Sequence, residues 1–342
     1  FDAAIEQNSN HWYWYKLRAV THFHLGHLED ALADIRTAVD KNPADGSNFY
    51  WMPPDLVAAC PDQSFRDGVL ELADATVAEH DSAYVRIGRA SLLEAFGEDV
   101  LAETDLDKAI ELEPENYDWR TWRISFFSER ERWSELGTEL ATVIELKPEQ
   151  HYRYYQLALV ALIEEHESEY QQACLQMLET FEDSDEPMET QFTAWTCALA
   201  PNAVDDYAVP LTLAESAVEA EPENQQYLNT LGAIQLRAGQ YEEALTTFDQ
   251  TIAVAGNENT SSAYDYYFRA LAEQALDRPD DARLSLVKAN ELAAEELENE
   301  DNPPPWNRKL TLELLRSEAE ELIEPADDHE PESPSPPEEN ND

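Results

Sequence analysis

Residues 228–248 read LNTLGAIQLRAGQYEEALTTF, and this stretch decides the fold. Gly232 is a small residue of the kind found where two helices cross, and Gly239 is suited to ending a helix. The residues that follow carry apolar side chains at the spacing of one helical face: Tyr241, Ala244 and Phe248. The stretch therefore predicts two antiparallel helices joined by a tight turn.

The same unit recurs along the chain in steps of about 34 residues. Units are expected to begin near residues 12, 49, 83, 117, 154, 191, 225 and 263. A single unit cannot cover its own apolar face, so neighbouring units must stack and share a core. The pattern predicts an all-α solenoid of about eight antiparallel two-helix repeats over residues 12–297.

The repeated small, aromatic and proline positions resemble the tetratricopeptide repeat, most closely in the units that begin at 12, 83, 225 and 263. The resemblance extends over about residues 1–297 and implies a right-handed superhelix. It also implies that the first helix of each repeat lines a concave groove that binds a peptide or a protein. Six residues match inward positions of that groove and form the expected partner-binding set: Tyr13, Lys16, Phe23, Tyr84, Tyr264 and Tyr267.

Both ends of the sequence depart from the repeat. Residues 1–11 are typical of the second helix of a truncated preceding repeat, and residues 298–323 of a linker and a C-terminal capping helix. Residues 324–342 combine prolines with acidic residues and contain no Lys or Arg. Such a segment cannot bury enough apolar surface to offset the cost of ordering, so a disordered acidic tail is expected.

A narrower resemblance covers residues 194–245 and the closing WNRKLTLELLRSEAEELI. Together they are similar to the C-terminal repeat region of large planctomycete proteins that commonly carry a serine/threonine protein kinase domain upstream. This resemblance implies further domains before Phe1 in the same polypeptide. The chain would then be the regulatory or substrate-docking arm of a larger kinase.

The net charge of the chain is −51. Such a surface repels phosphates, so nucleic-acid binding is not expected. The acidity fits either a basic partner or a saline environment. The sequence holds no apolar run long enough to span a membrane. Cys60, Cys174 and Cys197 are scattered, which favours buried reduced thiols and a cytoplasmic protein.

Four arginines occupy the seventh position of their units: Arg18, Arg89, Arg123 and Arg269. We interpret them as structural residues that pair with carboxylates of neighbouring helices. His22, His24 and His27 suggest a metal site, but residues two apart point to different sides of a helix, and Gly26 ends the helix before His27. No metal site, cofactor or catalytic constellation is therefore expected.

The sequence favours a non-catalytic scaffold that holds a peptide or protein partner in its concave groove. Two alternatives remain open at this point. The first is the kinase arm described above. The second is an assembly module that pairs with itself through its amino-terminal face.

Overall fold

The computed structural model describes residues 1–49, 54–254 and 260–323, which contain helices and no strand. The all-α prediction is confirmed. The chain divides into two compact units, Phe1–Lys147 and Pro148–Asp342. The expected acidic tail, residues 324–342, lies outside the described residues.

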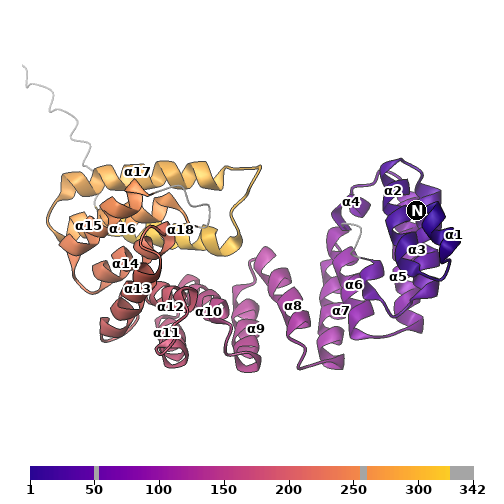
Figure 1. Cartoon of the computed structure of the whole chain (residues 1–342), viewed down its shortest axis with the longest axis horizontal. Coiled ribbons are helices and arrows are strands. Elements are labelled where there is room, and N and C mark those ends of the chain that lie inside the picture. The colour runs from indigo at the N-terminus through magenta and orange to yellow at the C-terminus, as the bar shows by residue number, and fades with distance from the viewer. Residues whose placement is uncertain (50–53, 255–259, 324–342) are drawn as a thin grey trace, which may run out of the picture. The chain divides into compact units, whose positions relative to one another are not determined.

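The first unit consists of helical pairs that follow one another along the chain (Figure 1). Its elements are α1 (Asp2–Gln7), α2 (Trp12–His24), α3 (Leu28–Lys41), a 3-10 turn η1 (Gly46–Asn48), α4 (Pro54–Ala58), α5 (Gln63–Glu79), α6 (Ala83–Ala95), α7 (Asp99–Leu112), α8 (Tyr117–Glu129) and α9 (Trp133–Leu146). In the second repeat, the described residues before α5 form η1 and α4, and α4 begins at Pro54, because proline is tolerated in the first turn of a helix.

Over the described residues 148–254 and 260–323, the second unit has four helical pairs and one further helix (Figure 1). Its helices are α10 (His151–Ile163), α11 (Glu167–Phe181), α12 (Pro187–Ala198), α13 (Ala208–Ala220), α14 (Gln225–Arg237), α15 (Tyr241–Ala253), α16 (Ser262–Ala275), α17 (Pro279–Leu297) and α18 (Trp306–Leu322). The first helices of successive pairs contact one another, α10 with α12, α12 with α14 and α14 with α16. They form the inner layer of this unit.

Four expected repeat starts are also the first residues of helices: Trp12, Ala83, Tyr117 and Gln225. The helices expected to start near 154, 191 and 263 begin at His151, Pro187 and Ser262. The crossing expected at Gly232 is present, because a methyl group there would lie 2.5 Å from the ring of the buried Phe248. The residues that predicted the hairpin are thus the residues that pack it.

The four seventh-position arginines pair with carboxylates, as the sequence analysis expected. Each pairs with a buried acid: Arg18 with Asp34, Arg89 with Asp105, Arg123 with Glu139 and, within α16 itself, Arg269 with Glu273. Each also reaches a second, exposed acid earlier in the chain: Asp2, Asp74, Asp107 and Asp249. In the first three cases the buried acid lies on the second helix of the same repeat. These ion pairs therefore tie consecutive helices together.

Gly88 on α6 packs against the backbone of η1, and this contact leads to a stability prediction. A methyl group at Gly88 would lie 2.1 Å from the carbonyl oxygen of Gly46. We expect Gly88→Ala to destabilise the fold by about 2 kcal/mol, because the strain exceeds the gain in helix propensity. Gly68→Ala is the matched control, since its methyl group meets only the movable side chain of Leu32. Thermal unfolding should show a lower Tm for Gly88→Ala than for Gly68→Ala and the wild-type chain. Equal Tm values for the two variants would contradict the packing argument.

Candidate functional site

The strongest candidate for a binding site is a pocket on the inner layer of the second unit. It has a volume of about 170 Å³. The residues that line it come from four inner helices, from the first turn of α18 and from one residue before α16: Tyr152, Tyr155, Gln191, Phe192, Trp195, Gln226, Asn229, Thr230, Thr260, Tyr264, Pro305, Asn307 and Arg308. Aromatic rings and amides thus share one cavity.

The aromatic residues of the pocket form a packed cluster. The rings of Trp195 and Tyr264 lie 5.5 Å apart, and the ring of Phe192 lies 5.6 Å from that of Tyr152 and 5.9 Å from that of Tyr155. Burial raises the pKa of Tyr152 to about 12 and also raises the pKa values of Tyr155 and Tyr264. These phenols remain protonated at neutral pH and can donate hydrogen bonds.

The amides of the pocket are fixed by a hydrogen-bond chain. Gln226 Nε2 donates to Gln191 Oε1 at 3.2 Å, and Gln191 Nε2 donates to Thr230 Oγ1 at 2.8 Å. Asn229 also lines the pocket, and its Nδ2 donates to Asp265 Oδ1 at 2.7 Å. Burial raises the pKa of Asp265 to about 7, although bonds from Asn229 and Gln225 oppose the rise. The polar wall of the pocket is therefore preorganised.

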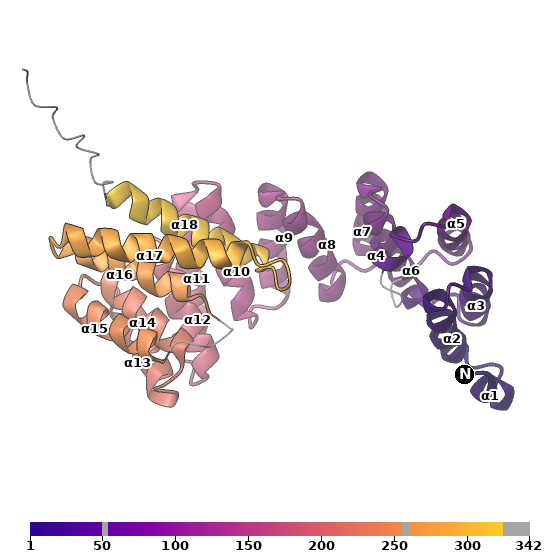
Figure 2. The ribbon, with the colours of Figure 1, turned by 90° about the horizontal axis from the view of Figure 1, so that it is seen from above.

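Helix α18 does more than cap the last repeat. It contacts α16 and α17 as expected, and it also contacts α10 in the first pair of the unit (Figure 2). Tyr155 Oη on α10 lies 2.9 Å from Thr311 Oγ1 on α18. Arg237 Nη2 on α14 donates to Glu318 Oε2 on α18 at 2.6 Å. The first turn of α18 thereby becomes one edge of the pocket. The sequence analysis missed this because the paired residues are far apart in the chain.

The structure disperses the six residues expected to line a groove. Tyr267 is fully buried and donates to Asn290 Oδ1 at 2.7 Å, so it presents no surface to a partner. Tyr264 is also buried, but it does line the pocket of the second unit. For Tyr267, the expectation of an open groove position was wrong, because this fifth position of the repeat packs against the partner helix α17.

The other four residues lie in the first unit. Lys16 is 2 % exposed, and its ammonium donates to Asp45 Oδ2 at 3.1 Å and to Ser47 Oγ at 2.6 Å. Burial lowers the pKa of Lys16, and Asp45 opposes that shift. Lys16 therefore ties α2 to the turn before η1, which corrects its expected role as an exposed groove residue.

The remaining aromatics of the first unit are partly accessible. Phe23 packs against Phe65, with ring centroids 5.4 Å apart, and Tyr84 stacks on Trp119 at 5.7 Å. Tyr13 is 44 % exposed and stands beside the rings of Trp12 and Trp14. These residues do not join one another in a single site.

The first unit carries a hollow of its own, with a volume of about 500 Å³. Helices α4, α6 and α8 line it, and its acidic residues are Asp55, Glu94 and Glu129. Burial raises the pKa of Glu94, although Arg130 donates to it at 2.9 Å. Three carboxylates and the guanidinium of Arg130 give the lining of this hollow a net negative charge.

The structure also bears on the cysteine and histidine expectations. Cys60, Cys174 and Cys197 are buried and free, as expected. His24 is exposed and does not belong to the cluster that His22, His27 and Asp30 form. The argument against a metal site from helical spacing therefore does not apply to His22 and His27. Within the described residues, no helix is long and apolar enough to cross a membrane.

Comparisons with known proteins agree with the helical-hairpin architecture. Residues 1–46 and 204–260 match the family model described as tetratricopeptide repeat. No curated protein matches the chain. Among solved structures, YrrB, a TPR protein with an unusual peptide-binding site, is 18% identical over 61% of this chain and 99% of its own, with a TM-score of 0.42.

Two further solved structures are similar over more of the chain. A tetratricopeptide repeat protein from Parabacteroides merdae is 15% identical over 89% of this chain and 98% of its own, with a TM-score of 0.36. PilF of Pseudomonas aeruginosa is 13% identical over 85% of this chain and 95% of its own, with a TM-score of 0.36. Similarity at this level carries no argument about function.

Proposed function

We propose, from the tetratricopeptide repeats that the chain contains in residues 1–46 and 204–260, that it is a protein-interaction module whose second unit binds a peptide. The observation that carries the proposal is the pocket of aromatic and amide residues between the inner helices and α18. Aromatic rings bury area at little cost in side-chain entropy, and amides hydrogen-bond a peptide backbone.

The pocket also suggests what the peptide must look like. A volume of about 170 Å³ accommodates one large apolar side chain, and its rings supply an apolar wall. Gln226 and Asn307 are partly exposed at the pocket and offer both donors and acceptors. Because the chain carries a net charge of −51, basic residues on either side of the anchor would be favoured.

Selection of peptides from a random library against the purified chain tests this proposal. We expect the selected peptides to share an aromatic or large aliphatic anchor flanked by Lys or Arg. The double substitution Tyr152→Ala and Gln226→Ala should weaken their binding at least tenfold, since it removes one wall and one hydrogen-bonding amide. Fluorescence anisotropy with labelled peptides measures the change.

Val287→Ala on α17 is the matched control, because Val287 is exposed and is absent from the pocket lining. It should leave the affinity unchanged. The proposal fails if no peptide binds, or if the pocket variant and the control bind equally well. Circular dichroism of each variant checks that the helices are intact.

Two expectations from the sequence stay predictions. The regulatory arm of a larger serine/threonine kinase is the alternative function, and the sequence preceding Phe1 tests it through the presence or absence of a kinase catalytic loop. A cytoplasmic location is proposed on the free, buried cysteines. Catalysis, nucleic-acid binding and a membrane segment are not proposed for this chain.

A further inference from the structure

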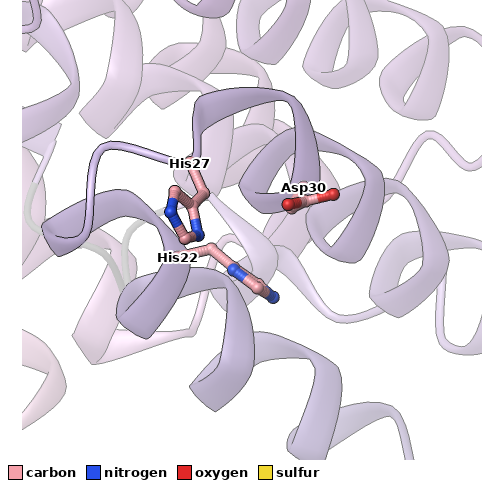
Figure 3. Close-up of side chains that lie close together, drawn as sticks. All are labelled: His22, His27 and Asp30. Atoms are coloured by element: carbon pink, nitrogen blue, oxygen red, sulfur yellow. The ribbon is translucent and has the colours of Figure 1, made fainter.

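The turn between α2 and α3 brings two histidines together. Gly26 has a φ of +76°, a conformation that reverses the chain after the last turn of α2. The backbone N–H of His27 then donates to the carbonyl of His22 at 2.9 Å, and the two imidazole centroids lie 5.8 Å apart. Figure 3 shows the rings side by side, with the carboxylate of Asp30 nearby on α3.

These three residues each offer one metal-ligating atom, and the three atoms lie within 4.8 Å of one another. Tetrahedral zinc with bonds of about 2.1 Å requires donor atoms roughly 3.4 Å apart. His27 and Asp30 are exposed, so their side chains can rotate to close this gap without disturbing the core. The backbone therefore already presents the ligand set.

A neighbouring carboxylate lies beside the first of these ligands. Asp34 is held by Arg18, whose Nε and Nη2 donate to its two oxygens at 2.8 and 2.7 Å. His22 Nε2 lies 3.8 Å from the same carboxylate. At 3.8 Å the contact is electrostatic and not a hydrogen bond, and it involves Nε2, so that Nδ1 is the nitrogen left to bind a metal.

That other nitrogen is unsatisfied. His22 Nδ1 is buried and has no hydrogen-bond partner among the residues that the structure describes. A buried polar atom without a partner is costly, so native structures rarely leave one. A metal ion bound between His22, His27 and Asp30 would satisfy it.

We propose that His22, His27 and Asp30 form a binding site for a divalent transition metal of the zinc class. Two imidazoles and one carboxylate favour such an ion over Mg²⁺ or Ca²⁺, which prefer oxygen ligands. Water completes the coordination at this exposed position. The ion links the last turn of α2 to the first turn of α3, the hairpin at the start of the first unit.

Calorimetric titration of the chelator-treated full chain with Zn²⁺ tests the site. We expect one ion per chain to bind with a micromolar Kd. His27→Ala and Asp30→Asn should each weaken binding at least tenfold, because each removes one of three protein ligands. His24→Ala is the matched control, since it removes an exposed histidine three residues from His27 and should change nothing.

Co²⁺ absorption separates this site from weak binding to the acidic surface. Nitrogen ligation should produce a visible absorption band in the wild-type chain and in His24→Ala, and the band should disappear in His27→Ala. The proposal is overturned if Zn²⁺ binding does not saturate at one ion per chain. It is equally overturned if His24→Ala and His27→Ala lose the same affinity, or if His27→Ala keeps the cobalt band.

Discussion

Arg89→Met is expected to destabilise the pair α6–α7 by about 3 kcal/mol, because it leaves a buried carboxylate short of its main partner. Asp105 is 0 % exposed, and Arg89 donates to both of its oxygens at 2.6 and 2.8 Å. Arg86 supplies one further bond at 2.7 Å. Asp105 gives the pKa of Arg89 its largest upward shift, through a side-chain hydrogen bond, and burial opposes that shift.

Native-state hydrogen exchange of amides in α6 and α7 measures this effect, because it reports the stability of one segment of the chain. Adding Asp105→Leu to Arg89→Met should recover most of the loss, since the unpaired buried charge is then gone. Lys108→Ala is the control, because Lys108 lies on α7 together with Asp105. Its partner Glu111 is exposed, so this substitution should lower the stability by less than about 0.5 kcal/mol. If Arg89→Met lowers the stability of α6 and α7 no more than Lys108→Ala does, the structural role of the arginine pairs is contradicted.

The stability of the second unit should fall as the pH rises from 5 to 8, through the ionisation of Asp265. Its pKa is about 7 in the folded chain against an ordinary value of 3.8, so the folded state binds the proton more tightly. The free energy of unfolding therefore includes a full contribution from the protonated Asp265 below about pH 4. This contribution falls as the pH rises and is lost once the pH passes about 7. From pH 5 to 8 the loss amounts to roughly 3 kcal/mol. Asp265→Asn should remove this part of the pH dependence.

Urea unfolding at each pH tests this expectation by comparing each variant with the wild-type chain. Asp265→Asn should become the more stable protein above pH 7, where the wild-type chain must bury a charge. Asp281→Asn, an exposed change on α17, is the control and should follow the wild-type pH dependence. Parallel curves for Asp265→Asn and the wild-type chain would show that the buried carboxyl group does not titrate in this range.

The sequence predicts the hairpins well because they depend on local contacts. Gly232 and Phe248 lie sixteen positions apart and meet in the structure, and three of the four seventh-position arginines find their buried acids at the same separation. Spacing within one repeat fixes such contacts. The irregular second repeat is harder to predict, because its described residues before α5 form only the short elements η1 and α4.

The candidate site is less predictable, because exposure depends on which helix covers which face. Lys16 and Tyr267 occupy positions that resemble a groove, yet each is covered by a neighbour in its own unit. The edge that α18 adds to the pocket depends on contacts such as Tyr155 with Thr311. No local pattern reveals a pairing over that distance. Polar residues at inner positions, Gln191 and Gln226, are the signal that could have identified the pocket.

Hydrogen exchange of the chain with and without a selected peptide tests the central claim most directly. If the second unit binds peptides through its pocket, the peptide should slow exchange in α10, α12, α14 and the first turn of α18. Helices α2 to α9 should exchange at unchanged rates. Protection confined to the first unit, or spread over α11, α13 and α17 with none in the inner helices, would contradict the account.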